Sequence, residues 1–131
     1  MTLEFTVNKP RQKVFEYLTD MQKFVEVHPV IFKMDKINEN EYLVYEKLNY
    51  IPFPFKYKAV VEGNQAGDKV FIKATVMKII HIRMSFDLLE MKEETKITEN
   101  VDFRSFLPVH PVMRSIFRTQ HNILFANISK A

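Results

Sequence analysis

The chain has 131 residues, 47% hydrophobic and 27% charged, and its formal net charge is +3. This length is enough for one hydrophobic core, so we expect a single domain over residues 1–131. The sequence contains no cysteine, which excludes disulfides, thiol catalysis and cysteine-rich zinc sites. The sequence contains no run of lysine and arginine and no apolar run long enough to cross a membrane, so we expect no nucleic-acid partner and no integral membrane association. The polar start, MTLEFTVNKPRQ, resembles neither a signal peptide nor an anchor, and we expect a cytoplasmic protein.

The N-terminal segment predicts a short strand followed by two short helices. Residues 3–7 alternate between apolar and polar side chains, which is typical of a half-buried strand. Asn8 is then expected to cap the first helix, with Pro10 in its first turn. Asp20 is expected to start the second helix, which must end before Pro29 because a residue that precedes proline disfavours helical geometry.

From residue 30 onward the apolar side chains recur at every second position, which predicts about six antiparallel strands. The first of them, over residues 30–37, places Phe32 on the inner face, and a third strand of the chain covers residues 41–50. The segment 70–88 carries its apolar side chains at even positions throughout. Two strands that share one buried face keep this parity if a loop of odd length joins them, and we place that loop near Met77–Ile79. Residues 95–103 form the last predicted strand.

The C-terminal segment predicts one long helix that starts with Pro111 in its first turn. Its predicted apolar stripe consists of Val112, Met113, Ile116, Ile123, Leu124 and Ile128. This stripe must be buried, and the concave face of a meandering sheet is the only large apolar partner. We therefore predict an α+β helix-grip fold. A curved antiparallel sheet of about six to seven strands wraps around the long C-terminal helix, with two short helices after the first strand.

With this order of elements the chain resembles the START-like (SRPBCC) superfamily, of the polyketide cyclase/dehydrase and lipid-transport type. The resemblance covers the whole chain, as a single START-like ligand-binding domain, and rests on the opening VNKPRQKVFEYLTDMQKFVEVHP and the closing TKITENVDFRSF…MRSIFRTQHNILFANI. Leu18-Thr19-Asp20 and His28-Pro29 match the Leu-x-Asp and His-Pro positions of the family. The resemblance implies an apolar cavity between the C-terminal helix and the sheet, suited to a lipid, a polyketide or a similar ligand. The family has no universal catalytic residues, so the resemblance assigns none.

The four letters VHPV occur twice, at 27–30 and 109–112. Their flanks diverge, so we interpret them as two joints, a helix exit at His28 and a helix start at His110, rather than as an internal repeat. His110 and His121 are eleven residues apart, roughly 16 Å along a helix, so one metal ion cannot bridge them. We expect no metal and no cofactor. A histidine at the cavity mouth that takes part in ligand binding or proton transfer remains the alternative.

Polar side chains that interrupt apolar strand faces define the candidate site. A buried carboxylate without a partner is costly, so Glu46 and Glu99 must be paired, protonated or hydrated. Tyr57 lies on the predicted inner face of its strand, where its hydroxyl group could help to orient a ligand. The alternative is that these strand faces are wrong by one residue, or that a strand end reaches solvent. The candidate ligand-binding residues are Glu46, Tyr57, Glu99, His28, Phe86, Phe103, Gln120 and Met84. No residue is assigned a catalytic role.

Two further features near the predicted cavity have two interpretations each. Arg104, Arg114 and Arg118 are typical of a solvated face, with contact to an anionic head group as the alternative. The segment IPFPF (51–55) indicates either an apolar lip over the cavity entrance or a bend packed on the core.

The sequence favours binding of a small hydrophobic or amphipathic molecule in an internal cavity, with transport of that molecule as a further role that such a cavity allows. One alternative is a cyclase/aromatase-type enzyme in which Glu46 or Glu99 moves protons together with Tyr57 or His28. Another is a protein-interaction or co-chaperone module, which predicts a filled interior. The identity of the ligand, and the choice between a monomer and a homodimer, stay open.

Overall fold

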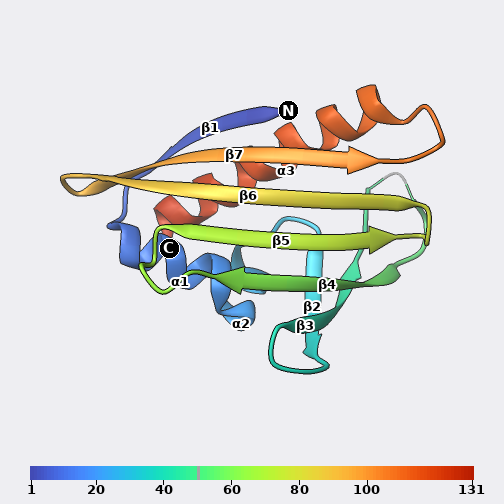
Figure 1. Ribbon diagram of the computed structural model, residues 1–131, viewed down its shortest axis with the longest axis horizontal. Helices are drawn as coiled ribbons and strands as arrows, with labels where there is room; N and C mark the ends of the chain where they lie inside the picture. The colour runs from blue at the N-terminus through green and yellow to red at the C-terminus, as the bar shows by residue number, and fades with distance from the viewer. Residues whose placement is uncertain (50) are drawn as a thin grey trace.

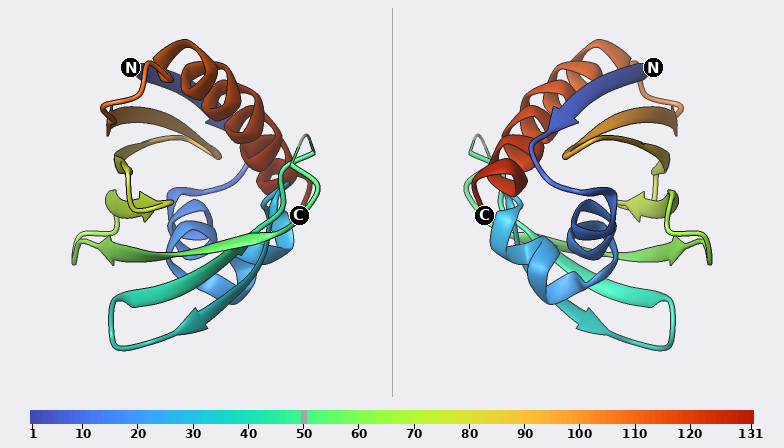
Figure 2. Two further views of the ribbon diagram at one scale, coloured as in Figure 1. Left: turned by 90° about the vertical axis from the view of Figure 1, so that its right-hand side faces the viewer. Right: turned by 90° about the vertical axis from the view of Figure 1, so that its left-hand side faces the viewer.

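The computed structural model describes residues 1–49 and 51–131, and Tyr50, predicted to end the third strand, lies outside the described residues. The chain folds into a seven-stranded sheet that curves around a long helix (Figures 1 and 2). Its elements, in chain order, are β1 (Thr2–Val7), α1 (Arg11–Thr19), α2 (Met21–Val27), β2 (Ile31–Lys36), β3 (Glu41–Glu46), β4 (Phe55–Gly63), β5 (Lys69–Val76), β6 (Ile80–Met91), β7 (Glu94–Arg104) and α3 (His110–Lys130).

The strand order in the sheet is β1-β7-β6-β5-β4-β3-β2, and every neighbouring pair is antiparallel. Strands β2 to β7 therefore form a meander, and β1 adds to the outer edge of β7. Helix α3 runs along the concave side of this sheet, with α1 and α2 below it (Figure 2). The predicted helix-grip fold is confirmed. The backbone of α3 lies nearest to β1 and α2, which leaves space between the helix and the central strands.

The main hydrophobic core joins α1 and α2 to the inner face of the sheet. Val14 and Leu18 of α1 are fully buried there, because a spacing of four residues places both on one face of the helix. Gly63 at the end of β4 packs directly under α1. A Cβ atom at this position would overlap the ring of Phe15, so a larger residue here would force that ring to move.

The start of α1 differs from the prediction, whereas the start of α2 agrees with it. Asp20 caps α2, and its side chain accepts hydrogen bonds from the backbone N–H groups of Gln22 and Lys23. Asn8, however, is not the cap of α1. Pro10 holds the cap position in an extended conformation, and the helix begins at Arg11, three residues after Asn8.

Two predicted inner faces are wrong in part. β2 contains a bulge between Ile31 and Lys33, which turns Phe32 outward to an exposed fraction of 52%. On α3, Ile123 is exposed and lies outside the buried stripe, whereas Val112, although exposed, lines the cavity under this helix. The buried stripe consists of Phe117, His121, Leu124, Phe125 and Ile128. The helix advances about 100° per residue, so Ile123 lies on the side opposite to His121.

The loop between β5 and β6 confirms the prediction from parity. Val76 pairs with Ile80, so Met77, Lys78 and Ile79 form a three-residue connection. Met77 and Lys78 both have positive φ angles, 55° and 62°, and residues other than glycine adopt such angles at a cost in free energy. This strained turn lies at one end of the cavity described next, because Met77 is among the residues that line it.

Candidate functional site: a cavity between the sheet and helix α3

A cavity of about 350 Å³ lies between the concave face of the sheet and α3. Most of its wall is apolar. Six of the eight residues predicted as candidates line it, namely His28, Glu46, Tyr57, Met84, Phe86 and Gln120. Glu99 and Phe103 are the two that do not. The positions of these side chains are thus established, whereas their contacts with a ligand stay predictions.

Glu46 and Tyr57 form a hydrogen-bonded pair in the wall of the cavity. The Tyr57 hydroxyl donates to Oε1 of Glu46 over 2.7 Å. The two residues lie on adjacent strands in diagonal positions, since Val44 is the direct partner of Tyr57 and Phe55 that of Glu46. Burial raises the pKa of Glu46 above its ordinary value, and the hydrogen bond from Tyr57 opposes this shift. Burial also raises the pKa of Tyr57 well above its ordinary value, so Tyr57 stays a neutral hydroxyl group.

His28 is held as a neutral ring whose orientation follows from the chain around Pro29. Its Nδ1 accepts hydrogen bonds from the backbone N–H groups of Val30, over 3.2 Å, and Ile31, over 3.0 Å. An accepting Nδ1 carries no proton, so the neutral ring has its proton on Nε2. Burial and, to a smaller extent, the charge of His121 lower the pKa of His28 to about 3. His28 therefore contributes a hydrogen-bond donor rather than a cation to the cavity wall.

Glu99 and His121 meet behind the cavity. Nδ1 of His121 lies 2.6 Å from Oε1 of Glu99, and both side chains are buried. His121 lines the cavity and covers Glu99, whose second oxygen, Oε2, has no hydrogen-bond partner among the described residues. Glu99 is therefore connected to the cavity wall through its hydrogen bond with His121. The charge of His121 also acts on His28 and Glu46, so these polar groups share one part of the cavity.

His121 is a site residue that the apolar stripe predicted for the C-terminal helix did not include. A signal for it exists in the sequence. His121 follows Phe117 by four residues and precedes Phe125 by four, and residues at this spacing share a helix face. The rings of Phe117 and Phe125 pack edge-on against the imidazole, with centroids 5.5 Å and 6.5 Å away. A buried carboxylate on the facing strand provides the polar partner that such a histidine needs.

Phe103 supports the helix instead of lining the cavity. Its ring stacks on Phe117 with a centroid distance of 6.1 Å, inside a second, smaller core cluster. The second VHPV copy is a joint as expected, because His110 starts α3, is exposed, and packs against Phe103. In the segment 51–55, Ile51 and Phe55 line the cavity, whereas Phe53 is 59% exposed.

The cavity wall is poor in basic side chains. Among residues 1–49 and 51–131, no lysine or arginine lines it. The same residues contain no group of three histidine, aspartate or glutamate side chains placed to hold a metal ion. None of the helices in this part of the chain is long and apolar enough to span a membrane.

The family comparison links the sequence to one known group. The carbon monoxide dehydrogenase CoxG family matches residues 4–79, which is more than half of the chain. No curated protein matches the sequence.

Solved structures share the fold at low sequence identity. The di-domain aromatase/cyclase BexL from the BE-7585A biosynthetic pathway aligns with 98% of this chain at a TM-score of 0.85 and 11% identity, and the match spans only 45% of that longer protein. A START superfamily protein from Mycobacterium smegmatis gives a TM-score of 0.83 at 10% identity, over 99% of this chain and 94% of the other. The ZhuI aromatase/cyclase from Streptomyces sp. R1128 gives 0.81 at 12% identity, over 99% and 90%. The START-like fold expected from the sequence is thereby confirmed, and at such identities the likeness shows the fold alone.

Proposed function

The chain belongs to the carbon monoxide dehydrogenase CoxG family, and we propose that it binds a small, uncharged hydrophobic molecule in the cavity under α3. The observation that carries the proposal is the cavity itself. Protein interiors are close-packed, so a space of about 350 Å³ with a mainly apolar wall is not an ordinary packing defect. Ligand pockets in proteins have this size and this composition, with a few polar groups that orient the ligand.

The polar groups in the wall favour a ligand without a negative charge. Glu46 is a carboxyl group, His28 is neutral, and among the described lining residues no lysine or arginine is present to pair with an anion. A carboxylate or phosphate buried beside these groups would lose its hydration and would find only His121 as a counter-charge, which is already bound to Glu99. A hydroxyl or carbonyl group, in contrast, can accept a hydrogen bond from Nε2–H of His28. We therefore propose a neutral ligand with one such group at the polar part of the cavity.

The experiment that tests this proposal is mass spectrometry of the freshly purified protein under native conditions, beside the same sample after denaturation. We expect an additional mass of a few hundred daltons in the native spectrum alone. If no adduct is present, and the protein takes up neither long-chain alcohols nor neutral aromatic compounds from a panel, the proposal is wrong. The interaction-module alternative would then take its place.

A second candidate function is acid–base catalysis on the bound molecule, and the Glu99–His121 pair is the observation that favours it. A carboxylate that binds one ring nitrogen orients a histidine and makes its other nitrogen a better proton acceptor. Nε2 of His121 is the nitrogen that Glu99 leaves free. The same native spectra, recorded before and after incubation with a ligand, separate the two functions. A carrier returns the ligand with its mass or stereochemistry unchanged, whereas an enzyme of the cyclase type converts it at a rate that depends on pH.

A further inference from the structure

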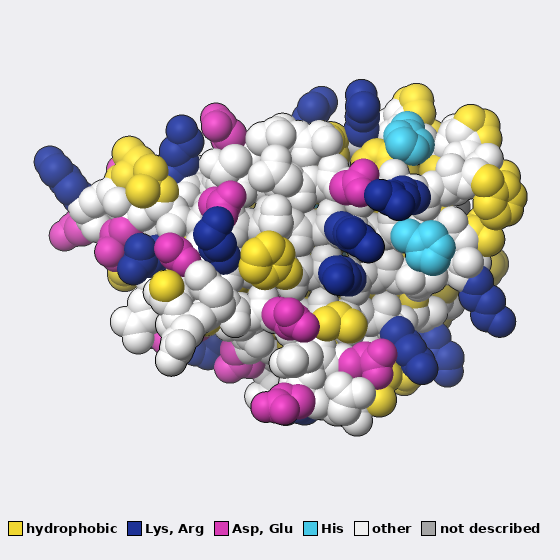
Figure 3. Space-filling view, viewed as in Figure 1, with side chains coloured by type: hydrophobic (Ala, Val, Ile, Leu, Met, Phe, Trp, Pro, Cys, Tyr) yellow, Lys and Arg dark blue, Asp and Glu magenta, His cyan; other side chains and the backbone are white. Residues whose placement is uncertain are grey.

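Basic side chains gather on part of the outer face of the sheet, which is turned away from the cavity, with acidic side chains at their edges (Figure 3). A hollow of about 500 Å³ lies among them on strands β4 to β7. Its four cations are Lys58, Lys73, Arg83 and Arg104, and we call it the outer basic hollow. Two acidic side chains, Glu41 and Asp102, stand at its two edges, so the hollow carries a net positive charge.

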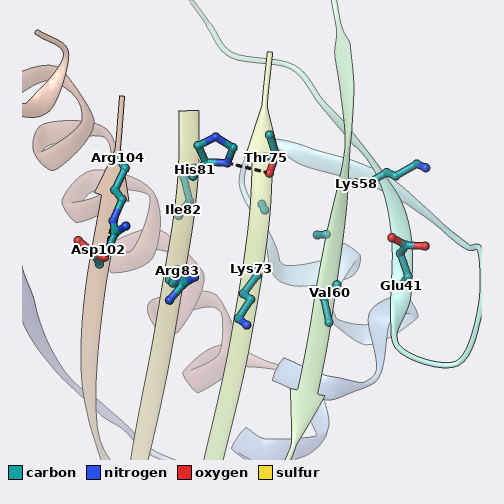
Figure 4. A pocket seen from close by; sticks show the side chains of 12 residues that line it. Glu41, Lys58, Val60, Lys73, Thr75, His81, Ile82, Arg83, Asp102 and Arg104 are labelled. Carbon is teal, nitrogen blue, oxygen red and sulfur yellow. Dashed lines mark hydrogen bonds and ion pairs between the residues drawn. The ribbon is translucent and has the colours of Figure 1, made fainter. Parts of the chain in front are cut away.

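The register of the strands places two cations directly opposite each other in the hollow. Lys73 on β5 is the cross-strand partner of Arg83 on β6, and Figure 4 shows their side chains next to each other. Like charges in this position destabilise a sheet. In the part of the chain that the structure describes, neither of the two takes part in an ion pair. On its other side Arg83 faces Asp102 of β7, which offsets part of this charge without forming an ion pair with Arg83.

The same pair of strands shows how the sheet neutralises a lysine elsewhere. Lys69 lies four residues before Lys73 on the same face of β5, and its cross-strand partner on β6 is Asp87. The Nζ atom of Lys69 is 3.0 Å from Oδ1 of Asp87. An acidic residue at position 83 would give Lys73 the same arrangement. With the arginine found there, the row Lys73, Arg83 and Asp102 keeps one excess positive charge, and this excess points to a binding role.

The next row across the sheet adds further donors around this pair. Thr75 and His81 are cross-strand partners, and Oγ1 of Thr75 lies 3.2 Å from Nδ1 of His81 (Figure 4). Lys58 pairs with Thr75 on one side, and Arg104 pairs with His81 on the other. The contact of Arg104 with Asp102 is long, at 3.8 Å, and solvent-exposed, so it holds the arginine only weakly.

We infer that the outer basic hollow binds a polyvalent oxyanion, namely the phosphate or pyrophosphate group of a soluble molecule or of a lipid head group. Lys73 and Arg83 would bind its oxygens directly, and Lys58 and Arg104 would approach from the two sides. Lysine supplies a point charge and arginine a fork of donors, the combination that phosphate groups favour. The site is separate from the ligand cavity, although Ala59 and Ala74 border both, so a single layer of sheet divides them.

The first experiment is a titration of the isotope-labelled protein with inorganic pyrophosphate at low ionic strength, followed by amide NMR. We expect saturable shifts with one site per chain at residues 73–75 and 81–83. The double variant Lys73→Gln, Arg83→Gln should weaken binding roughly ten-fold or more, because it removes two charged hydrogen-bonding groups. The matched control, Lys69→Gln with Lys96→Gln, removes the same net charge from the same face outside the hollow, and binding should change less than two-fold. Uptake of a neutral apolar dye by all variants checks that each one is folded.

A second arm distinguishes the two sources of the phosphate group. Vesicles of phosphatidylglycerol are compared with vesicles of phosphatidylcholine, for the wild type and for both double variants. Saturable pyrophosphate binding identifies a soluble ligand. Binding to phosphatidylglycerol vesicles that depends on Lys73 and Arg83, without a saturable pyrophosphate site, identifies a head group. The inference is overturned if the control variant loses as much affinity as the test variant, if neither probe binds, or if only an acidic peptide such as hexaglutamate occupies the face.

Discussion

His121 of α3 and Glu99 of β7 are 22 residues apart in the sequence, and their side chains meet at 2.6 Å in the interior of the protein. Glu99 is fully buried, and His121 is the one hydrogen-bond partner that its carboxyl group has among the described residues. The two groups therefore depend on each other. Loss of either one leaves a polar group in the core without a partner.

The first prediction follows from this dependence. Replacing the histidine alone (His121→Leu) leaves the Glu99 carboxyl group buried and unpaired, so we expect the free energy of unfolding to fall by about 3 kcal/mol or more. The double variant Glu99→Leu, His121→Leu should recover most of that loss, because no unpaired polar group remains. Urea unfolding of the two variants measures the difference. Equal losses in the single and double variants would contradict the coupling.

The second prediction concerns pH and His28. Its pKa is about 3 in the folded protein, against 6.5 in the unfolded chain, so below pH 6.5 the unfolded chain takes up a proton that the folded protein does not. The stability that the neutral His28 side chain contributes to the folded protein is therefore fully present above pH 6.5. It is lost as the pH falls toward 3. Between pH 7 and pH 5 the loss is about 2 kcal/mol.

The control for this prediction is His28→Asn, which keeps an acceptor for the backbone N–H groups of Val30 and Ile31 but does not titrate. Urea midpoints at pH 5 and pH 7 should differ less for this variant than for the wild type. The same difference in both proteins would show that other groups cause the acid sensitivity.

The third prediction concerns Glu46, whose pKa shift has the opposite sign. Its pKa is raised in the folded protein, so the folded state retains the proton at pH values where the unfolded chain has released it. Stability contributed by the protonated carboxyl group is present below the unfolded value of 4.5 and is lost as the pH rises through the folded value. The variant Glu46→Gln should therefore gain stability relative to the wild type as the pH rises from 4 to 8. Urea unfolding across this range checks the trend, and a constant difference would refute it.

The fourth prediction tests the charge of the ligand. N-phenyl-1-naphthylamine and 1-anilinonaphthalene-8-sulfonate differ by one sulfonate group, and the neutral dye should bind more tightly by fluorescence titration. Gln120 lines the cavity, so Gln120→Lys should shift this preference toward the anionic dye. Its neighbour Thr119 is exposed, and Thr119→Lys is the matched control for a charge outside the cavity. If both lysine variants change the preference equally, the dyes bind elsewhere.

The fifth prediction uses a small side chain in the wall of the cavity. Ala74 points inward from β5, so Ala74→Ile should occupy part of the cavity and weaken binding of the neutral dye roughly ten-fold. Thr75→Ile, on the outer face of the same strand, should leave that affinity unchanged. Retained affinity in the Ala74→Ile protein would place the dye outside the cavity.

Much of the fold was predictable because its strands alternate strongly. The even positions from Val70 to Leu88 predicted both strands and the turn between them, and the structure places that turn at Met77–Ile79. Phe32 was assigned to the wrong face because a bulge shifts the alternation by one residue without changing the composition of the strand. Ile123 was assigned to the buried stripe because it is apolar and adjacent to Leu124, although a turn of about 100° per residue points its side chain away from the sheet.

The site was less predictable, because it depends on contacts between distant elements. Glu46 and Tyr57 were found as polar interruptions of apolar strands, and the structure pairs them. The partner of Glu99 was missed, because it depends on where α3 crosses β7. The outer basic hollow was missed for the same reason. Its four cations come from four strands, and only the register of the sheet brings them together.

The cavity has a consequence for the life of the protein in a cell. Wall atoms that face this space of about 350 Å³ lack the close-packed neighbours of an ordinary core, and a bound ligand supplies those contacts. A ligand present at 100 times its dissociation constant adds about 2.7 kcal/mol. Intracellular proteases degrade the unfolded fraction of a protein, so the empty form should be turned over faster than the occupied form. The abundance of this protein would then follow the supply of its ligand, even at a constant rate of synthesis.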